Sequence, residues 1–123
     1  MPTIYLVDDS PTIRMSVAEN LERAGFALEA FPDAVSALAQ LKGGGAPDLL
    51  ITDLNMPGMD GISFIREVRT MQAMRFKPIL FLTTESEQSK REEARAAGAT
   101  GWLVKPVPAE DLLGAIRQVL PGV

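Results

Sequence analysis

The chain has 123 residues, the size of one ordinary domain, and it contains neither cysteine nor histidine. These two absences exclude disulfides, thiolate zinc sites, thiol nucleophiles and a Ser-His-Asp triad, so any chemistry must use carboxylates, hydroxyls, lysine or arginine. The net charge of −4 argues against a broad nucleic-acid footprint. No apolar run has the roughly 20 residues of a membrane span, and the first residues carry no basic signal segment, so we expect a cytoplasmic protein without a membrane contact.

Strand-like runs and helical patterns alternate five times along the chain. Each strand is indicated by a short, mainly apolar run, and the run before Asp53 is continuously apolar in its middle, as expected for a strand buried on both faces. The expected strands lie at about 3–7, 26–30, 48–52, 79–82 and 100–104.

A helical pattern follows each strand. The first runs from about residue 11 to residue 24, and Gly25 stops it. The next three helices are expected to begin after capping residues, and the last has Pro108 at its first helical position. The caps are Asp33, Asp60 and Ser86. The expected apolar faces are Ile13, Val17 and Leu21 in the first helix, Val35, Leu38 and Leu41 in the second, Ile62, Ile65 and Val68 in the third, and Leu112, Ile116 and Val119 in the last.

The alternation of strands and helices indicates a single α/β domain. Five strand–helix units form a parallel sheet with right-handed crossovers and helices on both faces. Ligands of such sheets bind outside the carboxyl ends of the strands. The residues that directly follow each strand are therefore the candidate functional residues.

Polar side chains suited to phosphoryl chemistry stand at four of these strand ends. Asp8 and Asp9 follow the first strand, and Asp53, Thr83 and Lys105 follow the third, fourth and fifth strands. Three carboxylates brought together repel each other, and a bound Mg²⁺ ion, which prefers oxygen ligands, removes that conflict. Asp53 then has the makings of a nucleophile that attacks phosphorus and forms an acyl phosphate.

These strand ends also carry a resemblance to response-regulator receiver domains, in the order and spacing of that family. The resemblance covers essentially the whole chain, 1–123, and it implies a flavodoxin-like (βα)5 fold with strand order 2-1-3-4-5 and no output domain. The motifs that carry it are Val7-Asp8-Asp9-Ser10, Thr52-Asp53-Leu54-Asn55-Met56-Pro57, Leu82-Thr83 and Val104-Lys105-Pro106.

The resemblance implies how the acidic residues divide the work. Asp53 is the phosphoacceptor, and the cofactor is Mg²⁺, for which Mn²⁺ can substitute. Asp9, the Asp53 carboxylate and the backbone carbonyl of Asn55 are implied as direct metal ligands. Asp8 is implied to act on the metal mainly through water.

The resemblance also implies which residues respond to the phosphoryl group. Thr83 and Lys105 contact it, and the bond between Lys105 and Pro106 is expected to be cis. Trp102 stands at the position of the family's switch aromatic, although taken by itself it is more typical of a core residue than of a switch. The residues implied to tune hydrolysis are Asn55 and Glu85.

Within the family, the chain resembles the CheY-like stand-alone chemotaxis regulators. That resemblance implies a mostly monomeric protein that catalyses only its own phosphorylation and dephosphorylation. The phosphodonor would be a histidine kinase or a histidine phosphotransfer domain. The target would be a flagellar motor switch or another signalling protein, bound through the last two helices and the strand between them.

Other functions remain open from the sequence. The chain could be a phosphorelay intermediate or a phosphate sink. A small Mg²⁺-dependent phosphatase would need a second acid beside its nucleophile, where Leu54 and Asn55 stand instead. A flavodoxin-like nucleotide or flavin binder would need a phosphate loop after the first strand, where two aspartates would repel the ligand. An inactive pseudo-receiver is disfavoured because every acidic position is filled.

Overall fold

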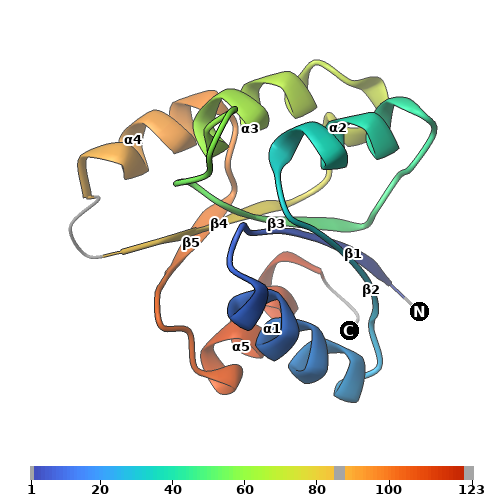
Figure 1. Ribbon diagram of the computed structural model, residues 1–123, viewed down its shortest axis with the longest axis vertical. Coiled ribbons are helices and arrows are strands. Elements are labelled where there is room, and N and C mark those ends of the chain that lie inside the picture. Colours follow the sequence, from blue (N-terminus) through green and yellow to red (C-terminus); the bar gives the residue numbers. More distant parts are fainter. Residues whose placement is uncertain (1, 85–87, 121–123) are drawn as a thin grey trace.

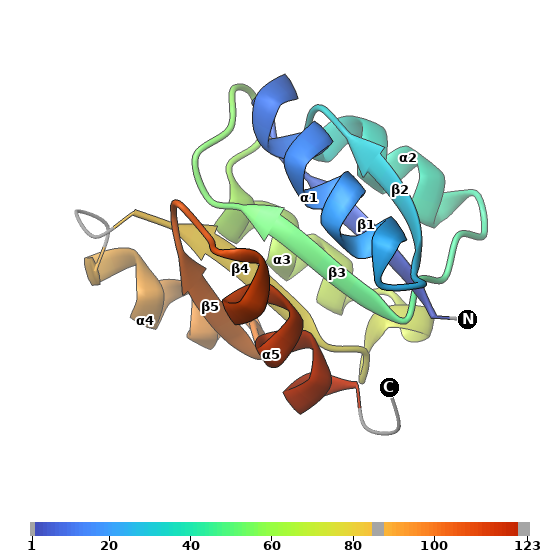
Figure 2. The ribbon, with the colours of Figure 1, turned by 90° about the horizontal axis from the view of Figure 1, so that it is seen from below.

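Five parallel strands form one sheet in a computed structural model, which describes residues 2–84 and 88–120. The strand order β2-β1-β3-β4-β5 confirms the expected order, and Figure 2 shows it face-on behind α1 and α5. The strands are β1 (Thr3–Val7), β2 (Ala27–Phe31), β3 (Leu49–Asp53), β4 (Ile79–Thr83) and β5 (Gly101–Val104).

Helices cover both faces of this sheet. Figure 1 shows α2, α3 and α4 on one side and α1 and α5 on the other, so the sheet is the middle of three layers. None of the helices in the described ranges is long and apolar enough to cross a membrane. The α-helices are α1 (Pro11–Arg23), α2 (Ala34–Lys42), α3 (Gly61–Arg69), α4 (Gln88–Ala97) and α5 (Ala109–Val119), and a short 3-10 helix, η1, spans Gln72–Met74.

Several expected boundaries are wrong by one residue. The strand expected at 48–52 includes Asp53, because Asp53 continues the pairing with β4 opposite Leu82. The strands expected at 26–30 and 100–104 begin one residue later, and the helix expected at 11–24 ends at Arg23. Pro108 is the N-cap of α5 and not its first helical residue, because its ψ of 146° is extended.

The second helix also buries a different face from the one expected. Val35 is 62% exposed, because a helix turns about 100° per residue and the side of α2 that meets the sheet holds Ala34, Ala37, Leu38 and Leu41. Asp33 and Asp60 cap α2 and α3 as expected. The expected cap Ser86 lies outside the described residues.

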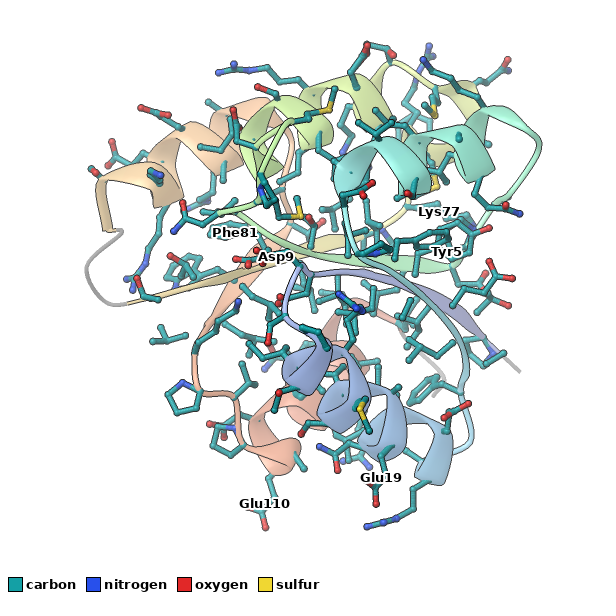
Figure 3. The ribbon with its side chains drawn as sticks, viewed as in Figure 1. Tyr5, Asp9, Glu19, Lys77, Phe81 and Glu110 are labelled. Atoms are coloured by element: carbon teal, nitrogen blue, oxygen red, sulfur yellow. The ribbon has the colours of Figure 1, made fainter. Side chains whose placement is uncertain are left out.

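The core consists of two apolar layers, one on each side of the sheet. Alternate residues of β1 divide between them: Tyr5 and Val7 face the layer under α2, α3 and α4, whereas Ile4 and Leu6 face the layer over α1 and α5. Figure 3 shows Tyr5 lying between the sheet and α2, while Glu19 and Glu110 project outward from α1 and α5. Both faces of the central strands β1, β3 and β4 are therefore buried, which explains their continuous apolar runs.

The start of α3 lies directly against the end of β3. The N–H of Gly61 donates to the carbonyl of Leu54 at 2.9 Å, and the carboxylate of Asp60 accepts a hydrogen bond from the Ser63 N–H at 2.9 Å. A Cβ at Gly61 would lie 2.6 Å from the Cα of Leu54 and would collide with the carbonyl of Asp53. Only glycine lets the helix come this close to the strand end that carries Asp53.

Replacement of Gly61 by alanine should therefore destabilise the fold. We expect Gly61→Ala to lower the free energy of unfolding by about 1–3 kcal/mol, the usual range for overpacking. Gly114→Ala in α5 is the matched control, since nothing lies within 4 Å of its added Cβ, and it should raise stability by about 0.5–1 kcal/mol. Urea unfolding of both variants measures the two effects. Equal stability of Gly61→Ala and the native chain would contradict the close approach.

Candidate phosphorylation and metal site

Three carboxylates meet at the carboxyl ends of β1 and β3. Asp8 and Asp9 follow β1, and Asp53 is the last residue of β3, next to β1 in the sheet. One oxygen from each carboxylate lies within 4.8 Å of the others. Figure 3 shows Asp9 near the end of β1, at the edge between the two helical layers. Asp9 is exposed while Asp8 and Asp53 are buried, so the cluster opens to solvent on the side of Asp9.

Lys105 binds both buried carboxylates at once. Its Nζ lies 3.0 Å from Asp8 Oδ2 and 2.9 Å from Asp53 Oδ2. The fifth strand brings Lys105 to this point, and the Lys105 N–H donates to the carbonyl of Thr83 at 2.7 Å. The bond from Lys105 to Pro106 is cis, which confirms that expectation. The lysine is therefore fixed to the strand next to it as well as to its two acids.

The pKa values of Asp53 and Lys105 are both raised, which disfavours the charged form of the acid and favours the charged form of the base. Burial raises the pKa of Asp53; the hydrogen bond and charge of Lys105 pull it down and the charge of Asp8 pushes it up, and the net direction is upward. Burial by itself lowers the pKa of Lys105, but its bonds to Asp53 and Asp8 outweigh burial and raise it. Lys105 thus stays charged, while the Asp53 carboxylate is less stable in its charged form than an exposed aspartate.

The residues present fit a divalent cation. Three aspartates and one lysine leave a formal charge of −2, which a divalent ion would neutralise. Asp8 Oδ2 is buried and, apart from its ion pair with Lys105, accepts no hydrogen bond from the described residues. Asp8 Oδ1 accepts from the Ser10 N–H at 2.9 Å, so this carboxylate is already oriented. The all-oxygen donor set suits Mg²⁺.

Two further expected residues lie beside this cluster. Thr83 is fully buried at the end of β4, and its Oγ1 donates to the Thr84 carbonyl at 3.2 Å. The N–H of Asn55 donates to Asp53 Oδ1 at 3.3 Å, and its side-chain oxygen accepts from Lys90 Nζ at 3.1 Å. Glu85, expected to tune hydrolysis, lies outside the described residues.

Trp102 lies on the surface of β5 and not in the core. Its side chain is 40% exposed and stacks on Phe81 with the ring centroids 6.3 Å apart. The guanidinium of Arg91, from α4, lies over the Trp102 ring at 5.2 Å from its centroid, a cation–π distance. In this outward position Trp102 joins α4 to β5.

Sequence reasoning missed two residues that contact the site or the switch position. Lys90 and Arg91 are adjacent in α4 and reach Asn55 and Trp102 respectively. Both belong to a helix rich in charged residues, and nothing in that pattern separates them from solvent-facing side chains. Arg14 in α1 donates from Nη1 to the carbonyl of Asp8 at 2.7 Å.

Comparisons with known proteins agree with this geometry. The family model of the response regulator receiver domain matches residues 4–117. The chain is 37% identical to a chemotaxis protein CheY of Pseudomonas aeruginosa, over 98% of this chain and 97% of that protein. The structure of the chemotaxis response regulator CheY4 of Vibrio cholerae superposes with a TM-score of 0.92 at 43% identity, covering 98% of this chain and 99% of that one.

A second similar structure concerns the metal. The receiver domain of a sensor histidine kinase from Pseudomonas aeruginosa is described with a magnesium ion coordinated in the active-site cleft. It is 27% identical, with a TM-score of 0.88, and the match covers 96% of each chain.

The chain belongs to the response regulator receiver family. Within that family it is a CheY-like chemotaxis response regulator of two-component signalling, and not a classical enzyme.

Loss of the lysine should leave two buried carboxylates facing each other. We expect Lys105→Met to lower the free energy of unfolding by about 2 kcal/mol or more, because removal of one partner from a buried ion pair strands the other charge. Lys77→Met is the matched control: its pair with Asp48 spans 3.7 Å and both side chains are more than 40% exposed, so the loss should stay below about 1 kcal/mol. Urea unfolding at neutral pH compares the two. Similar losses in both variants would contradict the role assigned to Lys105.

Proposed function

We propose that the chain accepts a phosphoryl group on Asp53 from a partner phosphohistidine. The observation that carries this proposal is the position of the Asp53 carboxylate, which is 5% exposed, lies 2.9 Å from Lys105 Nζ and shares a cluster with Asp8 and Asp9. The chain has no histidine of its own, so the donor is a histidine kinase or a histidine phosphotransfer domain.

The transfer is an in-line displacement at phosphorus. An Asp53 carboxylate oxygen forms the new bond to phosphorus, the bond from phosphorus to the donor's imidazole nitrogen breaks, and the imidazole leaves with the electron pair. Mg²⁺ held by Asp9, Asp53 and the Asn55 carbonyl, and by Asp8 through water, would neutralise charge on the phosphoryl oxygens. Lys105 adds a fixed positive charge at Asp53. Hydrolysis reverses the state when water attacks phosphorus and Asp53 leaves as a carboxylate.

The phosphoryl group on Asp53 then alters the surface formed by α4, β5 and α5. Its negative charge attracts Lys105 and the hydroxyl of Thr83, which ends the strand beside β5. Trp102 moves inward from its position between Phe81 and Arg91, and the face formed by α4, β5 and α5 changes its affinity for a protein target. The chemotaxis relatives favour a target in motility, the flagellar motor switch or another signalling protein.

The phosphoacceptor can be tested directly. With Mg²⁺ and acetyl phosphate, the native chain should gain the mass of one phosphoryl group, and the gain should decay after the donor is removed. Asp53→Asn should show no gain, because an amide does not attack phosphorus, while Asp48→Asn keeps every residue of the site and should react normally. Intact-mass spectrometry reads the outcome. An undiminished gain in Asp53→Asn would place the modification elsewhere.

The movement of Trp102 has its own optical test. The chain has one tryptophan, so its emission reports this side chain alone. Beryllofluoride with Mg²⁺, which imitates the phosphoryl group, should shift the emission to shorter wavelength, because the ring leaves water for the interior. Thr83→Ala should lose most of the shift, since the hydroxyl no longer draws the loop toward Asp53. An unchanged emission in the native chain would refute the inward movement.

A further inference from the structure

A second lysine, Lys90 of α4, contacts a residue that is itself hydrogen-bonded to the phosphoacceptor. Lys90 Nζ donates to Asn55 Oδ1 at 3.1 Å, and the backbone N–H of Asn55 donates to Asp53 Oδ1 at 3.3 Å. Two hydrogen bonds therefore connect the Asp53 carboxylate to a cation on α4. The connection crosses 35 residues of sequence between Asn55 and Lys90, so it exists only in the folded chain.

The position of Lys90 in its helix is unfavourable for a cation. Lys90 is the third residue of α4 (Gln88–Ala97), at the end where the helix dipole favours negative charge. A lysine would be better placed in the last turn. The helix dipole therefore does not favour a lysine at this position.

The side chain of Lys90 also borders open space. Lys90 lines an open hollow of about 230 Å³ between α3 and α4, together with Asp60, Arg66 and Glu93. Its bond to Asn55 is solvent-exposed, and such bonds contribute little to stability and exchange easily.

We infer that Lys90 is a positioning residue for phosphorylation of Asp53. Its ammonium group, placed by Asn55 at the rim of the acidic cluster, draws an anionic phosphodonor toward a site whose own carboxylates repel it. Lys105, which Asp8 and Asp53 already bind, would interact with the phosphoryl group once it is on Asp53. Lys90 would instead attract the phosphodonor while it approaches the site. The inference rests on the proposed function, because it assigns Lys90 to the reaction at Asp53.

The test compares the rate of phosphorylation by acetyl phosphate with Mg²⁺, measured by intact mass over time. Lys90→Met keeps the stem and removes the charge, and it should slow the reaction about three-fold at low salt, the size of effect expected from one exposed charge pair. Lys90→Arg should restore most of the rate. Arg95→Met, on the same helix with an exposed side chain, is the matched control and should react like the native chain.

Two further measurements separate charge from structure. High salt should bring the native rate and the Lys90→Met rate together, because exposed charges are screened beyond about 10 Å at 0.1 M salt. The double variant Lys90→Met with Asn55→Ala should lose no more rate than the slower single variant, since both changes remove one linked contact.

The inference is overturned if Lys90→Met reacts at the native rate, if Arg95→Met slows it equally, if the loss is independent of salt, or if the two losses multiply. The result is distinct from failure of the proposed function. If the native chain forms no adduct on Asp53, the function itself fails; if the adduct forms at an unchanged rate in Lys90→Met, only the inference about Lys90 fails.

Discussion

The contact of Lys105 with two buried carboxylates is the interaction on which the site depends. Asp8 and Asp53 come from neighbouring strands β1 and β3, and Lys105 comes from the loop after β5, two strands away from β3 in the sheet. Only the parallel order of the strands brings these three residues to one edge. Without the lysine, two acids would be buried together against their mutual repulsion. The chemistry of the site therefore depends directly on the order of the strands in the sheet.

The charge balance of the site makes it sensitive to an incoming cation or phosphoryl group. Burial raises the pKa of Asp53 despite the nearby lysine, so its carboxylate is poorly solvated, and Lys105 divides its charge between two acids. The tight seat of α3 at Gly61 fixes the backbone of Asp53 and Leu54. A phosphoryl group or a divalent ion therefore enters a rigid frame, and the response must come from side chains that can still move, such as the half-exposed Trp102.

Much of this arrangement is readable in the sequence. The apolar runs predict the strands, and the polar residues directly after them, Asp8, Asp53 and Lys105, must converge once the strands are parallel. Their motifs and spacing carry the family resemblance. The cis bond after Lys105 was implied in the same way.

Other features depend on contacts that no local pattern encodes. Val35 fits a helical stripe, but the side of α2 that meets the sheet is set by packing with β1 and α3, and Val35 falls outside it. Trp102 looks like a core residue by type, yet it lies outside because Phe81 fills the layer beneath it and Arg91 covers its face. Lys90 belongs to a charged helix, and only the packing of α3 against α4 brings it to Asn55.

Asp53 is kept charged and buried for an incoming divalent cation or phosphoryl group, at a cost in stability. The most direct measurement is the free energy of unfolding of the native chain and of Asp53→Asn, each with and without Mg²⁺. Without metal, Asp53→Asn should be at least as stable as the native chain, because a buried charge is removed. Mg²⁺ at ten times its dissociation constant should stabilise the native chain by about 1.4 kcal/mol, and the variant by much less. A less stable metal-free variant, or an equal response to Mg²⁺ in both chains, would contradict the account.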